Sequence, residues 1–179
     1  VVMTSSDCLT GTDRVAEVSK KIQAKTYINV QGDEPIFNPK DIKKLLKSVK
    51  KYPKDIITGY CEIDNESSHK DPNVPKVVIR QDGRLLYASR APIPSNKSNK
   101  FEKGWRQVLA YAFPKEALKK ILSIKKKTEL EKIEDIEILR FLELGLEVRI
   151  VKMSKMSLAV DIPEDIILVK KMISKLEIN

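Results

Sequence analysis

Two acidic side chains, Asp33 and Asp161, stand just beyond apolar runs that are typical of buried strands. Ligands of open α/β sheets bind at the carboxyl ends of strands, so both carboxylates occupy positions where chemistry commonly takes place. Such carboxylates can hold Mg²⁺, which bridges phosphate oxygens and neutralises charge during transfer to phosphorus. Two simpler explanations stay open, because acids are common in turns after strands and the segment that begins at Asp161 is also a sound helix start.

Two arginines could add anion recognition to such a site. Arg14 lies at an expected helix start after a Gly-Thr loop, and Arg90 lies at a strand end that Pro92 and Pro94 hold rigid. An arginine in rigid surroundings suits bidentate binding of carboxylate or phosphate, although a surface arginine is the usual case. The sequence shows neither a Ser-His-Asp pattern nor a Gly-rich Walker loop, and His69, in a polar loop, is expected to be exposed.

A third group of charges surrounds one expected helix. Its acidic members are Glu131, Glu134, Asp135 and Glu137, and Arg140 follows them. Side chains three residues apart share a helix face, so Glu137 and Arg140 can pair within the helix. An amphipathic helix with a solvated face explains most of this pattern without any site.

The elements that must position these residues alternate in type. A strand is expected at 1–4, a helix from about residue 14, and a strand at 27–30. A helix at 41–51 follows Pro39, with its apolar residues on one face. This strand-helix order favours a parallel sheet that is covered by helices.

The second half contains a hairpin, because an Asp-Gly pair at 82–83 separates two apolar runs. The elements expected after residue 55 are, in order, a strand at 56–63, hairpin strands at 76–80 and 85–89, a strand at 107–113, helices at 115–124 and 133–144, strands at 146–151 and 158–160, and a helix at 163–176. Gly145 is the expected stop of the second of these helices.

Composition places the chain among cytoplasmic single-domain proteins. Its 179 residues, 41% of them hydrophobic, suffice for one domain over 1–179 with a real core. The net charge of +9 comes largely from paired lysines on expected helix faces, which a solvated surface explains, and we expect no nucleic-acid partner. Cys8 and Cys61 form no metal or redox motif and fit a reducing cytoplasm. No apolar run approaches the roughly 20 residues that span a bilayer, so no membrane partner is expected.

Six segments in this order resemble one enzyme family over essentially the whole chain. They are 10–14 (Thr-Gly-Thr-Asp-Arg), 29–35 (Asn-Val-Gln-Gly-Asp-Glu-Pro), 73–78 (Asn-Val-Pro-Lys-Val-Val), 86–94 (Leu-Tyr-Ala-Ser-Arg-Ala-Pro-Ile-Pro), 130–140 (Leu-Glu-x-Ile-Glu-x-x-Glu-x-Leu-Arg) and 159–165 (Ala-Val-Asp-Ile-Pro-Glu-Asp). The family that they resemble is that of the 3-deoxy-manno-octulosonate cytidylyltransferases, also called CMP-KDO synthetases. Several motifs in the same order are far more specific than any one of them.

The resemblance implies a Rossmann-like, three-layer α/β nucleotidyltransferase fold with a mostly parallel sheet and an inserted antiparallel hairpin. It implies transfer of CMP from CTP to 3-deoxy-manno-octulosonate (KDO), with release of pyrophosphate, in the activation of a lipopolysaccharide sugar. Asp33 and Asp161 become the catalytic carboxylates that bind Mg²⁺. The other implied site residues are Arg14, Gln31, Arg90, Gln107, Tyr111 and Glu137 around the sugar, and Gly11, Thr12 and Gly32 at the nucleotide. A homodimer is also implied, with residues 95–105 as the expected contact segment.

Departures from the family pattern keep alternatives open. The family's first unit, with a basic glycine-containing loop that grips the triphosphate, has no counterpart, so we expect this sequence to be part of a longer enzyme. Cys8 and Gln107 replace family histidines, which leaves room for an amino-substituted KDO or a nine-carbon acidic sugar. A polyol-phosphate nucleotidyltransferase fits the motifs less well. The non-enzymatic alternative is an inactive fragment that acts only as a basic binding domain.

Overall fold

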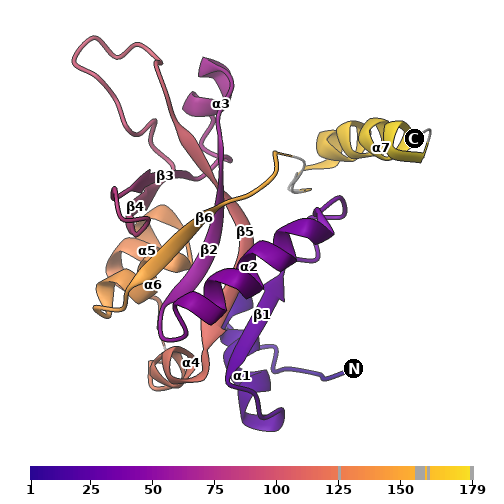
Figure 1. Ribbon diagram of the computed structural model, residues 1–179, viewed down its shortest axis with the longest axis vertical. Coiled ribbons are helices and arrows are strands. Elements are labelled where there is room, and N and C mark those ends of the chain that lie inside the picture. The colour runs from indigo at the N-terminus through magenta and orange to yellow at the C-terminus, as the bar shows by residue number, and fades with distance from the viewer. Residues whose placement is uncertain (125, 156–159, 161, 178–179) are drawn as a thin grey trace.

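The computed structural model describes residues 1–124, 126–155, 160 and 162–177. It shows a twisted six-stranded sheet between helices (Figure 1). In chain order the elements are α1 (Gly11–Lys21), β1 (Thr26–Val30), α2 (Pro39–Lys51), β2 (Ile56–Glu62), α3 (Glu66–Lys70), β3 (Lys76–Ile79), β4 (Leu85–Ser89), β5 (Trp105–Pro114), α4 (Lys115–Leu122), α5 (Glu129–Glu134), α6 (Ile138–Glu143), β6 (Val148–Lys152) and α7 (Pro163–Glu177).

The long strand β5 organises the sheet, whose order is β4-β3-β5-β2-β6 with β1 also paired to β5. Both β1 and β2 are antiparallel to β5, and β2 is parallel to β6. The strands β1, β2 and β6 therefore run in one direction, as the strand-helix alternation predicts. The expected mostly parallel pairing is nevertheless wrong for the described strands, because β5 runs the opposite way between β1 and β2. Only the β2–β6 ladder is parallel among the described pairings.

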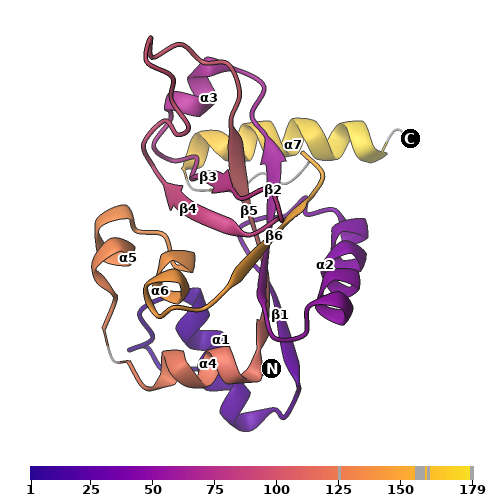
Figure 2. The ribbon, with the colours of Figure 1, turned by 60° about the vertical axis from the view of Figure 1, so that its left-hand side comes forward.

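Helices cover both faces of the sheet. In Figure 2, α1, α4, α5 and α6 lie on one side of the strands and α2 lies on the other. The first side holds the larger apolar cluster, with Phe113, Leu118, Leu139 and Phe141 fully buried. The second is smaller and centres on Leu45 of α2 against alternate residues of β5. Opposite faces of β5 thus supply the two cores, since neighbouring side chains in a strand point to opposite sides.

Local sequence explains where most of the helices begin and end. Thr10 caps α1, with its side chain accepting a hydrogen bond from the Asp13 N–H, so the helix begins earlier than the expected residue 14. Asn38 caps α2. Pro39 follows as the first helical residue, where a missing N–H costs nothing because that N–H has no partner within the helix. Gly145 follows α6 with a φ of 68°, which a glycine adopts without strain. The Asp-Gly turn likewise produces the β3–β4 hairpin, with Gly83 at a φ of 83°.

Three expectations about local structure are wrong. Residues 1–4 form no strand, and Val1, Val2 and Met3 are exposed. The helix expected at 133–144 is two helices, because the chain turns at Asp135, which has a φ of 50°. His69 lies in α3 and is 4% exposed. The strand expected at 158–160 falls mostly on residues outside the described ones.

His69 anchors the long β4–β5 connection, which projects from the body beside α3 (Figure 1). Its Nε2 lies 3.2 Å from the Ile93 carbonyl oxygen, and its ring packs 5.0 Å from that of Phe101. A Cβ on Gly104 would lie 2.8 Å from the His69 ring, so only glycine fits at this contact. The β4–β5 connection thus buries His69 of α3 by folding over it.

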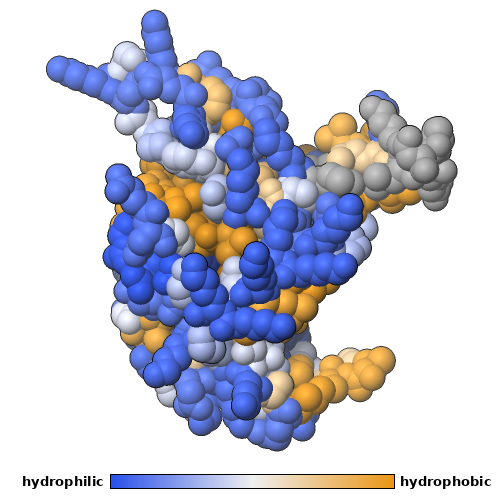
Figure 3. Space-filling view, in the orientation of Figure 1, coloured by the Kyte–Doolittle hydropathy of each residue, from blue (hydrophilic) through white to orange (hydrophobic). Residues whose placement is uncertain are grey.

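The face shown in Figure 3 is mostly hydrophilic, with apolar side chains showing in its middle, along part of α7 and near the amino end. Among the described residues, no helix has the length and apolar character needed to cross a lipid bilayer.

Candidate functional site

The candidate site forms where β5 changes neighbours. Its beginning pairs with β3 and its second half with β1. Between them, the backbone N–H of Leu109 donates to Glu34 Oε1 at 3.1 Å. Glu34 comes from the Gly-Asp-Glu-Pro segment after β1 and is buried. A side-chain carboxylate thus replaces the strand carbonyl that would otherwise pair with β5, and it holds the post-β1 segment against the sheet.

Asp33 directly precedes Glu34, beside the place where β5 changes partner strands, and it is exposed. Its carboxylate makes no hydrogen bond or ion pair with any of the described residues, while its backbone carbonyl accepts from the Val160 N–H at 2.9 Å. The expected metal partner, Asp161, lies outside the described residues. Gly32 beside Asp33 has open space on its Cβ side, so crowding does not explain the glycine.

Tyr111 lies at the floor of the site, 2% exposed, on the β5 face that points toward α1 and α6. Asn29 of β1 and Thr58 of β2 lie directly opposite it in the sheet. Burial raises the pKa of Tyr111 well above its usual value, and the nearby charges of Glu137, Glu34 and Asp33 raise it further. Tyr111 is therefore a neutral hydrogen-bonding group across the physiological pH range.

Gln107 lies two residues before Leu109 on the same face as Tyr111 and is 3% exposed. Its Nε2 lies 3.4 Å from both Tyr111 Oη and Thr58 Oγ1. Within the part of the chain that the structure describes, its Oε1 has no hydrogen-bond partner, and neither has the buried Nδ2 of Asn29. Two buried polar atoms of the site thus lack a partner among the described residues, which is uncommon for buried atoms.

Glu137 fixes the loop before α1 to the start of α6. One carboxylate oxygen accepts from the Gly11 N–H at 3.1 Å, and the other accepts from the N–H and hydroxyl of Thr12 at 2.9 and 2.5 Å. The acid thereby satisfies free N–H groups at a helix start, where negative charge is favourable. Gln31 lies against the same corner, because a Cβ on Gly11 would meet its amide at 3.4 Å. The structure thus brings Gly11, Thr12, Gln31 and Glu137 together.

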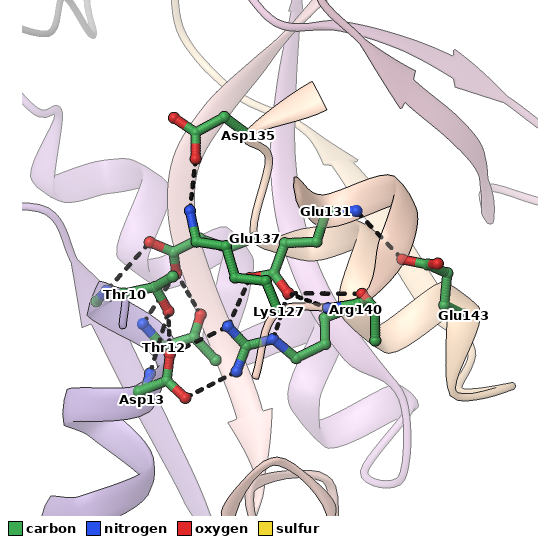
Figure 4. Close-up of polar contacts among 11 residues, drawn as sticks. Thr10, Thr12, Asp13, Lys127, Glu131, Asp135, Glu137, Arg140 and Glu143 are labelled. Carbon is green, nitrogen blue, oxygen red and sulfur yellow. Dashed lines mark hydrogen bonds and ion pairs between the residues drawn. The ribbon is translucent and has the colours of Figure 1, made fainter. Parts of the chain in front are cut away.

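Arg140 lies close to Thr12, Asp13 and Glu137 (Figure 4), and its side chain has no exposed surface. It binds Asp13 of α1 at 2.7 and 3.1 Å and Glu131 of α5 at 2.6 and 2.5 Å. Burial alone would raise the pKa of Asp13, but hydrogen bonds from Arg140 and Thr10 outweigh it and the pKa is lowered. The expected pairing of Arg140 with Glu137 inside one helix is absent from the described contacts. Arg140 instead links three helices.

The two other arginines behave differently from each other. Arg90 donates to the backbone carbonyls of Glu134, Pro72 and Asp135 at 2.6, 2.8 and 3.0 Å, and the Glu134 carboxylate accepts from the Arg90 N–H. Arg90 is therefore firmly held at the wall of the site. Arg14 is exposed and donates to Thr4 and to the Ser5 carbonyl, away from the Tyr111 cluster.

A cavity of about 640 Å³ opens over the part of β5 near Leu109, where the strand changes partners. This volume suits a small ligand. Its lining includes Glu34, Gln107, Leu109, Arg90 and Arg106 from the body and Leu168 from α7. A second hollow of about 660 Å³ lies at the amino ends of β1 and β2, between Lys25, Lys54 and Lys115. It contains none of the site residues, so we place the site in the first cavity.

Sequence reasoning found most of this cluster but missed two of its members. Glu34 appeared only as a second acid beside Asp33, although its position next to a proline after a strand was a usable signal. Asn29 read as an ordinary strand residue, since nothing local shows that an amide faces a tyrosine on a distant strand. Among the described residues, no group of three or more His, Cys, Asp or Glu side chains is arranged to hold a metal by itself.

Comparison with known proteins agrees with the motifs. Residues 1–154 match the family model described as cytidylyltransferase. A 3-deoxy-manno-octulosonate cytidylyltransferase of Acidobacterium capsulatum is 36% identical over 96% of this chain and 70% of its own length. The enzyme of the same name from Escherichia coli is 31% identical over 90% of this chain and 65% of its own length.

Solved structures show the same relationship. The structure of CMP:2-keto-3-deoxy-manno-octonic acid synthetase complexed with CTP superimposes with a TM-score of 0.88 at 30% identity, covering 97% of this chain and 72% of that one. HddC from Yersinia pseudotuberculosis, at 17% identity and a TM-score of 0.63, shares the fold. The expected α/β nucleotidyltransferase fold is thereby confirmed, and the chain belongs to the 3-deoxy-manno-octulosonate cytidylyltransferase family.

Proposed function

We propose that the protein is a CTP-dependent transferase that moves CMP from CTP to KDO, or to a close acidic sugar, and releases pyrophosphate. This step would activate the sugar for lipopolysaccharide synthesis. The observation that carries the proposal is the similarity, over nearly the whole chain, to relatives of that name and to a synthetase structure complexed with CTP. A cavity whose lining includes Glu34, Arg90 and Gln107 supports it.

Asp33 is the residue we propose for metal binding, with Asp161 as its partner. The Asp33 carboxylate is exposed and uncommitted, and Mg²⁺ is usually held by one or two carboxylates together with phosphate oxygens and water. The donor set therefore fits Mg²⁺. The Val160 N–H bond to the Asp33 carbonyl supports the pairing, because Val160 precedes Asp161 in the chain. When bound, Mg²⁺ would neutralise charge on the phosphates.

The sugar is proposed to lie against Gln31, Gln107, Tyr111 and Glu137. Gly11 and Thr12 would contribute indirectly, because their N–H groups are occupied by Glu137 and hold its carboxylate in place. Arg90 would shape the cavity wall. Arg90 and Arg14 are proposed to contribute positive charge toward the substrate carboxylate or phosphates, and Gly32 is proposed at the nucleotide. In the reaction, a sugar hydroxyl oxygen bonds to the α-phosphorus of CTP, the bond to the pyrophosphate breaks, and the hydroxyl proton is released. The chain contributes mainly positioning and charge complementarity.

Pyrophosphate release from CTP in the presence of KDO tests the proposal, with the protein expressed from its complete reading frame. We expect release to require both the sugar and Mg²⁺, and Asp33→Asn to lower kcat by at least about 100-fold. Asp7→Asn is the matched control, since Asp7 is an exposed acid near the amino end that lines neither cavity and has no part in the proposed chemistry. Equal activity of Asp33→Asn and wild type would remove Asp33 from the mechanism.

A homodimer and a cytoplasmic location complete the proposal. The projecting β4–β5 connection around residues 95–105 is the proposed contact, and both cysteines are free thiols, which suits a reducing compartment. Light scattering of the purified protein tests the first, with twice the monomer mass expected. Cell fractionation tests the second.

A further inference from the structure

Three connections of the chain meet at the second hollow, toward the lower end of the molecule in Figure 1. They are the α1–β1 turn, the α2–β2 turn and the junction of β5 with α4. The strand β1 begins beside this hollow and ends before Asp33, and its five residues span about 17 Å. The hollow is therefore separate from the candidate functional site.

Each of the three connections brings one lysine to the hollow, namely Lys25, Lys54 and Lys115. The ammonium groups of Lys25 and Lys54 have no partner among the residues that the structure describes. The ammonium group of Lys115 donates to the side-chain carbonyl of Gln23, which is a neutral group. None of the three positive charges is thus paired with a described carboxylate.

The acid in this lining does not balance these charges. Glu116 pairs instead with Lys119, which is not part of the lining, and the two groups lie 2.7 Å apart. The lining therefore carries three positive charges and one negative charge that is already engaged. Like charges that converge on one hollow repel each other, and an anion bound between them would remove that repulsion.

The chemistry of the lining favours a phosphate group as this anion. Lysine binds phosphate as a point charge, and several ammonium groups can share its oxygens. A phosphate monoester carries a charge of about −1.5 to −2 at pH 7, whereas a carboxylate carries a single charge and would neutralise only one lysine. The volume of about 660 Å³ also leaves room for an organic group beside the phosphate, against the apolar surface of Ala24, Pro53 and Pro114.

We propose that this hollow is a second binding site, which takes a phosphate monoester. Lys25, Lys54 and Lys115 hold the phosphate, and the organic part lies on Pro53 and Pro114. The site goes beyond the proposed transfer reaction and does not depend on it. A small organic phosphate and the headgroup of a phosphate-bearing lipid present the same group, so the experiment includes both sources.

An NMR titration of the complete protein with inorganic phosphate tests the site residue by residue. We expect saturable shifts of the backbone amide signals of Ala24, Lys54 and Glu116, which chloride at the same ionic strength does not reproduce. Changing Lys25→Gln and Lys54→Gln together should weaken this binding about 10-fold or more. Changing Lys43→Gln and Lys47→Gln together is the matched control, because these lysines are exposed on α2 and line neither cavity.

Vesicles of phosphatidylcholine with and without phosphatidic acid distinguish the two sources. Sedimentation of wild type and control, but not of the Lys25/Lys54 variant, with phosphatidic acid vesicles identifies a lipid headgroup. Phosphate binding that the Lys25/Lys54 variant loses, without sedimentation of wild type, identifies a soluble phosphate.

Three results would overturn the proposal. Equal phosphate affinity of the Lys25/Lys54 variant and the control would show that the two lysines hold no phosphate. Equal shifts with chloride would show that the hollow only attracts anions in general. Shifts confined to Gly32 and Leu109 would place the phosphate at the candidate functional site instead. Because none of these measurements uses turnover, their outcome is independent of whether the protein transfers CMP.

Discussion

Replacing Arg140 by methionine removes the charge that joins α1, α5 and α6. The guanidinium has no exposed surface and binds Asp13 and Glu131 through four contacts of 3.1 Å or less. Removing one partner of a buried ion network leaves uncompensated buried charge, which costs about 3 to 5 kcal/mol. Since Glu131 has no exposed surface either, solvent cannot take over the role of Arg140.

Urea unfolding followed by circular dichroism measures this loss. For a chain of this size, about 3 to 5 kcal/mol corresponds to a fall in melting temperature of roughly 6 to 20 °C. Arg80→Met is the matched control, because the Arg80–Asp82 pair is 45% exposed on both sides and water can replace it with little loss of stability. Adding Asp13→Asn and Glu131→Gln to Arg140→Met should recover part of the stability, since no unpaired charge remains. A loss below about 1 kcal/mol for Arg140→Met, or a further loss in the triple variant, would refute this reasoning.

Two further predictions concern pH and the long loop. Burial opposes ionisation of Asp13, but hydrogen bonds from Arg140 lower its pKa below the usual value of about 3.9. The stability that ionised Asp13 gives to the folded protein is therefore complete above that pH, and it is lost as the pH falls through the lowered pKa. Acid unfolding below about pH 4 should therefore be less pH-dependent in Asp13→Asn, and identical slopes would contradict the assignment. His69→Ala removes the contacts that hold the β4–β5 connection, so limited proteolysis should cut within residues 92–104 faster than in wild type. Unchanged cleavage would show that His69 does not anchor the loop.

Features set by local sequence could be predicted. The Asp-Gly turn produced its hairpin, the helix after Pro39 formed as expected, and Gly145 ended α6, because turns and caps depend on neighbouring residues. The motif residues Gly11, Thr12 and Glu137 are neighbours, although the family resemblance implied Glu137 at the sugar and the other two at the nucleotide.

Features set by distant contacts could not be predicted. The antiparallel insertion of β5 between β1 and β2 depends on pairings between strands far apart in sequence, which strand-helix alternation does not encode. Arg140 was expected to pair with Glu137 within one helix, whereas its ion-pair partners come from α1 and α5. His69 read as exposed because its burial comes from a loop more than twenty residues later in the chain.

The proposed reaction of this protein produces a CMP ester of an acidic sugar. Phosphorus NMR of a mixture of the complete protein, CTP, KDO and Mg²⁺ tests it most directly, because the product phosphodiester and pyrophosphate give separate signals. We expect equal amounts of the phosphodiester and of pyrophosphate, formed only when the sugar is present. Intact CTP, or pyrophosphate accompanied by free CMP and no phosphodiester, would contradict it.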